Sequence, residues 1–263
     1  FTTRQNIQFN WLALEQVPEV LGELATVQMH AIQTSGACVR NTTTDPLAGT
    51  VADEAIDPRV VCELIRQWST FHPEFAYLPR KFKIAVVATE EDRAAIEVHD
   101  VGIRIKKHVI HGLAFDLWVG GGLGRTPLLG HRLLADLPLD ELRNWLTAVL
   151  RVYNLAGRRD NKYKARIKIL VNAMGVEAFR EAVTHRYLTD HDSDLKINAE
   201  TLEDLGDSFS CKLEPQPIEG HQGSPDFQRW YRQNTKPHRI MGYRSVFLSL
   251  KRPGTAPGDV TAL

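Results

Sequence analysis

The chain has 263 residues with 32 basic and 32 acidic side chains, so its formal net charge is zero. This balance does not favour a nucleic-acid or anionic-membrane partner, and no apolar run approaches the roughly 20 residues of a membrane-spanning helix. The composition, 43% hydrophobic and 24% charged, is that of a globular protein. Three widely separated cysteines (Cys38, Cys62 and Cys211) predict reduced thiols and a cytoplasmic location.

The first elements are predicted from periodicity and turn signals. Residues 5–11 alternate between apolar and polar side chains, which predicts a strand with one apolar face. Pro18 opens a predicted helix over 18–27. A turn-rich loop follows at 41–46, and apolar residues at helical spacing predict a second helix over 58–69.

The middle of the chain mixes strands and helices. Residues 81–88 and 113–119 are predicted strands, and the second leads into a glycine-rich loop at 120–127. A helix is predicted over 139–155, with Gly157 placed just beyond its end. This alternation of element types favours an α+β or α/β fold class.

The last part of the chain has weaker signals. Asn161 is a suitable cap for a further helix, which Gly175 interrupts and which continues over 176–185. Residues 188–235 show little periodicity and are predicted to be a linker with partial structure. A final strand is predicted over 243–250.

Two lysines stand out in the strand predicted over 81–88. Lys81 and Lys83 are two residues apart and point to the same side, whereas Phe82 and Ile84 point to the other. Two ammonium groups on one face repel each other unless water or an anion lies between them. The pattern indicates either a site for a small oxyanion or a solvated face of a sheet.

Other segments have one functional and one purely structural interpretation each. Arg4 and Arg40 are suited to clamping a carboxylate or anion, or are exposed surface arginines. The loop 120–127 allows the backbone to approach a flat ligand, or is a tight turn; it has neither a Rossmann nor a Walker pattern. The basic run 158–168 is a solvated helix start or a docking surface for acidic groups.

Metal ligands are not predicted in this chain. His108 and His111 are three residues apart, but no third partner has zinc-like spacing. Cys38 is interpreted as a small buried apolar residue.

Taken together, the motifs occur in an order that resembles the sirohaem-dependent nitrite and sulfite reductases, closest to the bacterial sulfite reductase haemoprotein type. The motifs that carry this resemblance are Thr-Thr-Arg-Gln (2–5), Arg-Asn (40–41), Pro-Arg-Lys-Phe-Lys (79–83), Gly-Gly-Gly-Leu-Gly (120–124) and Asn-Lys-Tyr-Lys-Ala-Arg-Ile-Lys (161–168).

The resemblance implies a set of site residues. Sirohaem is expected to be contacted by Thr3, Arg4, Gln5, Arg80, Gly121 and Gly122. Arg40, Lys81 and Lys83 are expected to be the catalytic residues that hold sulfite or nitrite at the iron. Multi-electron reduction builds negative charge on the bound anion, and preorganised cations offset it. Electrons are expected from ferredoxin or a flavoprotein, through a [4Fe–4S] cluster.

One departure from the family is expected to matter. The family's cluster ligands follow a Cys-x5-Cys and Cys-x3-Cys arrangement, which the three cysteines here do not match. We therefore expect an internal fragment of a longer enzyme, without the cluster ligands and inactive alone. By analogy it divides into the end of a ferredoxin-like half-domain (1–36), the first nitrite/sulfite reductase domain (37–187), a linker (188–235) and the truncated start of a second ferredoxin-like half-domain (236–263).

The substrate stays open at this point. Sulfite reduction to sulfide is the main expectation, and nitrite reduction to ammonia is the alternative, because both anions suit the same cations. A tetrapyrrole- or anion-binding module without catalysis is the third possibility.

Overall fold

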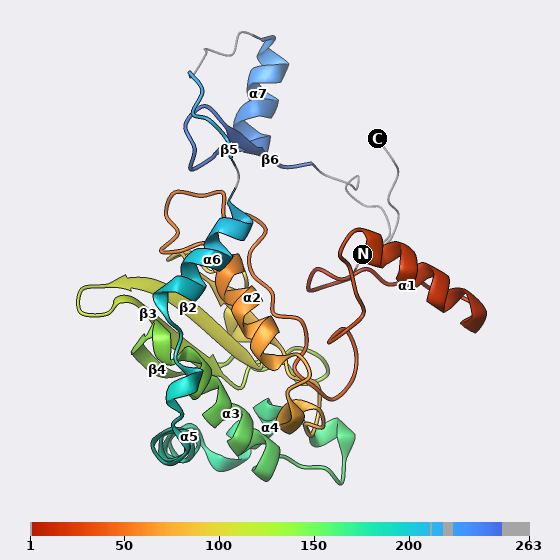
Figure 1. The fold of residues 1–263 in the computed structure, drawn as a ribbon, viewed down its shortest axis with the longest axis vertical. Helices are drawn as coiled ribbons and strands as arrows, with labels where there is room; N and C mark the ends of the chain where they lie inside the picture. The colour runs from red at the N-terminus through yellow and green to blue at the C-terminus, as the bar shows by residue number, and fades with distance from the viewer. Residues whose placement is uncertain (1, 211, 218–222, 249–263) are drawn as a thin grey trace.

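The centre of the molecule is a four-stranded mixed sheet (Figure 1). The computed structural model describes residues 2–210, 212–217 and 223–248. The strands lie in chain order: β1 (Ile84–Val87), β2 (Val101–His108), β3 (Gly112–Val119) and β4 (His131–Pro138). β1 runs parallel to β2, and the other two pairs are antiparallel.

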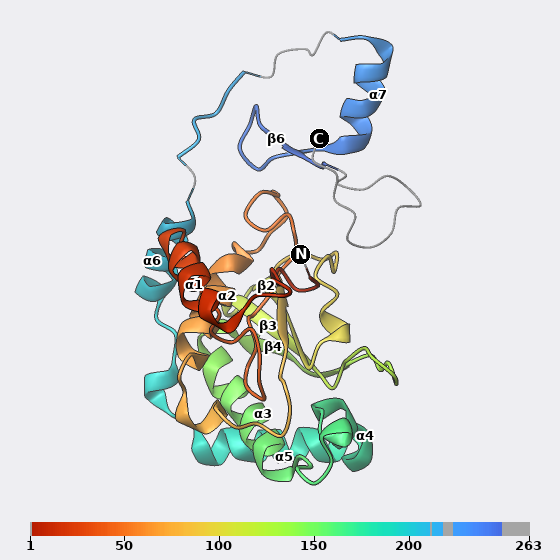
Figure 2. The same cartoon turned by 90° about the vertical axis from the view of Figure 1, so that its right-hand side faces the viewer.

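The other elements are mainly helical, which confirms the predicted α+β class. The longer helices are α1 (Val17–Thr26), α2 (Pro58–Ser69), α3 (Leu142–Ala156), α4 (Ile167–Met174), α5 (Val176–Asp190), α6 (Ala199–Phe209) and α7 (Pro225–Asn234). Short 3-10 turns occur at Leu14–Gln16, Pro73–Phe75, Ile96–Val98, Leu139–Glu141, Lys162–Lys164 and Ser193–Leu195. β5 (Thr235–Pro237) and β6 (Arg244–Val246) form a two-stranded sheet, which lies with α7 away from the main sheet (Figure 2).

The hydrophobic core joins the main sheet to helices α2, α3, α4 and α5. Phe82, Phe115 and Phe179 are fully buried in it, and each buried aromatic ring contributes a large apolar area. Tyr153 is also buried, and its hydroxyl donates to the Ala165 carbonyl at 2.7 Å. The core therefore fixes the segment before β1, which contains Phe82, relative to α3.

Local sequence explains where these helices begin and end. The Asp57 carboxylate accepts the backbone N–H of Arg59, and Pro58 follows as the first residue of α2. Gly175 separates α4 from α5 with a φ of +84°, a conformation that glycine adopts without steric cost. The predicted helices over 18–27, 58–69, 139–155 and 176–185 are thus confirmed, although α5 extends to Asp190.

The predicted strand over 5–11 is wrong. Thr2 and Asn6 form only an isolated bridge, Arg4 and Gln5 have positive φ angles, and Trp11 is 100% exposed. No strand in the described part of the chain pairs with these residues, so an extended conformation would leave the backbone groups without ladder partners. The alternating pattern predicted this strand wrongly, because the pattern does not show whether a neighbouring strand is available for pairing.

Other boundaries also differ from the prediction. β1 covers only Ile84–Val87, so Lys81 and Lys83 lie in the segment that precedes it. The side chain of Asn161 caps the 3-10 turn Lys162–Lys164 instead of a long helix. β2 and β4 were not predicted.

The C-terminal third contains more regular structure than a linker. α6 and α7 both fall within residues 188–235. The predicted strand 243–250 is shortened to β6, and its last two residues lie outside the described part of the chain. The domain boundaries stay predictions. No helix in the described ranges is long and apolar enough to cross a bilayer.

Candidate anion-binding site

A cavity of about 370 Å³ collects basic side chains from three separate segments. Its lining residues are Thr2, Thr3, Arg4, Asn6, Ile7, Gln8, Thr34, Ser35, Arg40, Asn41, Lys81 and Lys83. Five of the nine predicted site residues thus lie together. Gln5, Arg80, Gly121 and Gly122 do not line the cavity.

Arg4 holds the N-terminal segment against the sheet. Its guanidinium donates to the Thr43 hydroxyl at 3.0 Å, the Asn41 carbonyl at 2.5 Å and the Ile84 carbonyl at 3.1 Å. Burial lowers the pKa of Arg4 to about 10. The neighbouring Gln5 points elsewhere and donates to the Thr44 carbonyl at 3.0 Å. Arg4 is therefore committed largely to the protein.

Arg40 is oriented by the turn that precedes it. Its Nε donates to the Gly36 carbonyl at 3.0 Å and its Nη1 to the Thr34 carbonyl at 2.5 Å. Burial lowers its pKa, and the nearby Arg80 guanidinium lowers it further. Arg80 therefore stands close to the cation cluster although it does not line the cavity.

Lys81 and Lys83 are the unmatched cations of the cavity. Neither ammonium group has a hydrogen bond to any residue that the structure describes, whereas Phe82 between them is fully buried. Burial lowers the pKa of Lys83 to about 8, and the positive charges of Arg4 and Lys81 add to this effect. Burial also lowers the pKa of Lys81. Water or an anion in the cavity would relieve the repulsion between these groups.

Sequence reasoning missed an ion pair behind the lysines. Asp100 is fully buried, and its Oδ1 accepts from Nε of Arg166 at 2.8 Å. Its Oδ2 accepts the backbone N–H of Lys83 at 2.9 Å. Arg166 belongs to the basic run 158–168, but only the fold shows that it turns inward and pairs with a residue 66 positions away.

His99 lies beside this ion pair. Its Nδ1 is 2.8 Å from the Ala95 carbonyl. Burial lowers its pKa to about 4, and the charge of Arg4 acts in the same direction. His99 is therefore neutral at pH 7 and adds no charge to the cavity.

The glycine loop packs tightly against the rest of the chain. A Cβ atom on Gly121 would lie 2.1 Å from the Glu97 carbonyl oxygen, so glycine is required there for close backbone packing. The Lys168 ammonium donates to the carbonyls of Gly122 at 3.2 Å, Leu123 at 3.3 Å and Thr126. These contacts favour the interpretation of a tight turn. A role of Gly121 and Gly122 toward a cofactor stays a prediction.

The cysteines and histidines do not gather into a metal site in the described ranges, where no group of three or more His, Cys, Asp or Glu residues has suitable geometry. Cys38 and Cys62 are free thiols, and Cys38 is only half-buried. Burial raises the pKa of Cys62. Cys211 lies outside the described residues. The rings of His108 and His111 stack on each other at 4.8 Å.

Several known proteins are similar to this chain in sequence. The family described as "Nitrite and sulphite reductase 4Fe-4S domain" matches residues 35–191. Sulfite reductase [ferredoxin] 1 of Mycolicibacterium paratuberculosis is 40% identical over 185 residues, which are 70% of this chain and 33% of that protein. The ferredoxin–nitrite reductase of Synechococcus elongatus is 34% identical over 192 residues, or 71% of this chain and 37% of that protein.

Solved structures show the same likeness. The Mycobacterium tuberculosis NirA protein is 38% identical with a TM-score of 0.64, covering 70% of this chain and 34% of that one. Dissimilatory sulfite reductase I, at 11% identity and a TM-score of 0.52, shows a likeness of fold alone. The chain spans about a third of the length of the curated relatives described above. Because the family match covers more than half of its residues, the chain belongs to the nitrite and sulphite reductase family.

Proposed function

We propose that this chain is part of an assimilatory sulfite reductase and that its cation-lined cavity holds sulfite beside sirohaem. The observation that carries this proposal is the convergence of Arg4, Arg40, Lys81 and Lys83 on one cavity. Membership of the family supports it.

The residues at and near the cavity fit a cofactor rich in carboxylates. The Lys81 and Lys83 ammonium groups have no hydrogen-bond partner among the described residues, and the same holds for the guanidinium of Arg80. Such groups are suited to an anionic tetrapyrrole and a small oxyanion. When bound, sirohaem supplies the iron and passes on the electrons for the reduction. Its proposed contacts are Thr3, Arg4, Gln5, Arg80, Gly121 and Gly122.

The described residues do not fit an iron–sulfur cluster, because they include no suitable group of ligands. We propose that the cysteine ligands of a [4Fe–4S] cluster come from outside this chain. The names of two relatives include ferredoxin, which supports a donor of that type.

The side chains of the cavity have distinct proposed roles. Arg4 and Arg40 are fixed by carbonyl groups, so they offer preoriented positive charge to the anion. Lys83, with its pKa lowered to about 8 by burial, is protonated at pH 7 but gives up its proton more readily than an exposed lysine. We propose that Lys83 holds the anion and supplies it with a proton.

Nitrite is the second candidate substrate. The 34% identity with the Synechococcus elongatus ferredoxin–nitrite reductase favours it. Sulfite and nitrite are both small oxyanions, and the cavity presents the same cations to either.

The proposal is tested by reconstituting the purified chain with sirohaem and titrating it with sulfite and with nitrite. We expect a Soret band that shifts on addition of the preferred anion. Lys83→Met is expected to weaken that response, whereas Lys107→Met, which removes an exposed lysine outside the cavity, serves as the matched control. A folded chain that binds neither sirohaem nor anion would contradict the proposal. Turnover by this chain alone with methyl viologen would contradict the need for further parts of the enzyme.

A further inference from the structure

Lys83 is held at both of its backbone polar groups by two consecutive residues. Its N–H donates to Oδ2 of Asp100 at 2.9 Å, and its carbonyl accepts the N–H of Val101 at 3.1 Å. The side chain of Lys83 then extends into the anion cavity. The direction of its ammonium group therefore depends on where the residues 100–101 place the backbone.

Asp100 has no contact with solvent. Its other carboxylate oxygen, Oδ1, is paired with Arg166. Nε and Nη2 of Arg166 lie 2.8 and 2.7 Å from Oδ1. A buried carboxylate is stable only when hydrogen bonds and an opposite charge offset the loss of water. In addition, the Asp100 carbonyl accepts the N–H of Gly120 at 3.0 Å, which ties the same residue to the start of the glycine loop.

We propose that Asp100, held by Arg166, is a positioning residue that aims Lys83 at the bound oxyanion. This inference rests on the proposed function of the cavity. Asp100 does not line the cavity, and it acts through the backbone of Lys83.

Removal of the Asp100 charge separates positioning from simple electrostatics. If Asp100 contributed only its negative charge, Asp100→Asn would leave the cavity more positive and tighten anion binding. If Asp100 positions Lys83, the same change weakens binding, because a neutral amide holds neither Arg166 nor the Lys83 N–H as firmly. The two explanations therefore predict opposite signs for one measured quantity.

The chain offers a closely matched control at Asp116. This carboxylate is also buried, pairs with Lys106 at 2.6 Å and accepts the backbone N–H of Asp136 at 2.9 Å. It is absent from the lining of the anion cavity. Asp116→Asn therefore reproduces the loss of a buried, paired carboxylate without changing the support of Lys83.

The test measures nitrite and sulfite affinity of the chain by calorimetric titration, together with hydrogen exchange at the Lys83 amide. Asp100→Asn is expected to weaken anion binding roughly tenfold or more, since a charged hydrogen bond is lost, and to speed exchange at Lys83. Asp116→Asn is expected to change neither. Unchanged or tighter binding in a folded Asp100→Asn variant would overturn the proposal.

A second variant keeps the proposal testable if Asp100→Asn does not fold. Arg166→Lys retains the charge but cannot reproduce the paired guanidinium contacts, so we expect a smaller loss of affinity and faster exchange at Lys83. Native affinity together with native exchange would count against the proposal. If the wild-type chain binds no anion, the proposed function fails, and the exchange rates alone decide whether Asp100 holds Lys83.

Discussion

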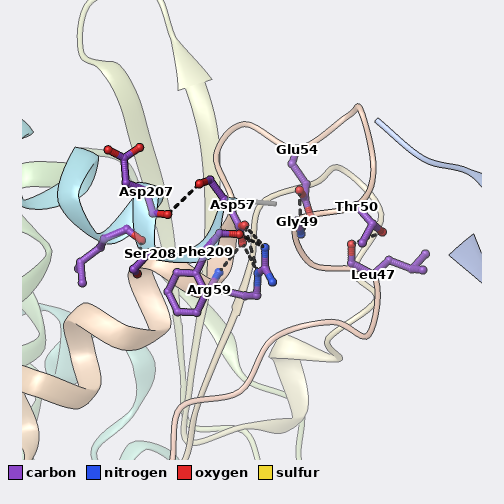
Figure 3. Close-up of polar contacts among 11 residues, drawn as sticks. Leu47, Gly49, Thr50, Glu54, Asp57, Arg59, Asp207, Ser208 and Phe209 are labelled. Atoms are coloured by element: carbon purple, nitrogen blue, oxygen red, sulfur yellow. Dashed lines mark hydrogen bonds and ion pairs between the residues drawn. The ribbon is translucent and has the colours of Figure 1, made fainter. Parts of the chain in front are cut away.

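Two regions of this molecule collect side chains of like charge, and they differ in whether those charges have partners in the protein. In the anion cavity, Lys81 and Lys83 stand near two arginines and have no hydrogen-bond partner in the described part of the chain. In the loop 47–57, the carboxylates of Glu54 and Asp57 each accept from a donor nearby (Figure 3). Glu54 accepts the Gly49 N–H at 2.9 and 3.1 Å, and Asp57 pairs with Arg59 at 2.6 Å.

Burial shifts the pKa values of one group from each region in opposite directions. Burial lowers the pKa of Lys83 to about 8 and raises that of Glu54 to about 7. The space inside the carboxylate loop is filled by side chains, since a Cβ on Gly49 would lie 2.2 Å from Nη2 of Arg59 and 2.6 Å from Oδ2 of Asp57. The basic side chains instead line a cavity that is formed by three separate segments. A charged side chain that lines a cavity and has no partner in the protein is therefore a better sign of a ligand site than a high density of charge or a shifted pKa.

The strongest test of this contrast is Lys83→Met. If Lys83 is reserved for an anion, its loss should weaken nitrite and sulfite binding by about 1.5–3 kcal/mol, the usual contribution of a charged hydrogen bond. Folding should not suffer, because a partly buried ammonium group among other cations is removed. Titration calorimetry and thermal unfolding measure the two effects. Lys107→Met is the control, and loss of stability without loss of binding would contradict the comparison.

Arg4→Met sharpens the comparison within the cavity itself. Unlike Lys83, Arg4 donates to the Thr43 hydroxyl and to two carbonyl groups. Its removal should lower the free energy of unfolding by about 2 kcal/mol. Chemical denaturation measures this change. The exposed Arg125 in the glycine loop provides the control variant Arg125→Met, which should stay within about 0.5 kcal/mol of the wild type. Equal effects of the two variants would show that Arg4 has no structural role.

Much of the fold was predictable because helices carry their own signals. Asp57 and Pro58 mark the start of α2, and Gly175 marks the break between α4 and α5. Strands depend on neighbours that a local pattern does not reveal. The alternation at 5–11 finds no partner strand, whereas β2 and β4 are stabilised by pairing with β3.

The site was predictable only in part, for a related reason. Lys81 and Lys83 were singled out by their spacing on a predicted strand, Arg4 and Arg40 were singled out as possible anion clamps, and the motif order then assigned all four to one site. Asp100 and Arg166 are 66 residues apart, and neither stands in a pattern that predicts their pairing. A buried ion pair of this kind becomes visible only once the chain is folded.

The pH dependence of anion binding tests the role of the Lys83 charge more gently than substitution. Burial lowers the pKa of Lys83 to about 8, so the group loses its proton as the pH rises through that value. Nitrite affinity should therefore fall roughly tenfold between about pH 7 and pH 9. Nitrite is the suitable probe because its own charge is constant over this range. In Lys83→Met the pH dependence of nitrite affinity should disappear. An unchanged pH dependence would show that another group causes it.

The smallest expected effect concerns the carboxylate loop. Burial raises the pKa of Glu54 from 4.5 to about 7, and the charges of Asp57 and Asp45 add to the rise. Between these two pH values the folded chain keeps a proton that the unfolded chain releases. The protonated Glu54 therefore contributes fully to the stability of the folded chain below about pH 4.5, and this contribution is lost as the pH rises through about 7.

Glu54→Gln tests that contribution directly. The amide oxygen can still accept the Gly49 N–H, but the side chain no longer titrates. We expect the free energy of unfolding above pH 7 to rise by about 1 kcal/mol after allowance for solvent screening, and the pH slope in this window to flatten. Denaturation at several pH values measures both, with the exposed Glu23→Gln on α1 as the control for a lost charge. Because Glu54 is not among the lining residues of the anion cavity, nitrite affinity should stay unchanged. A change in that affinity would show that the two regions are coupled, and their comparison as independent regions would then fail.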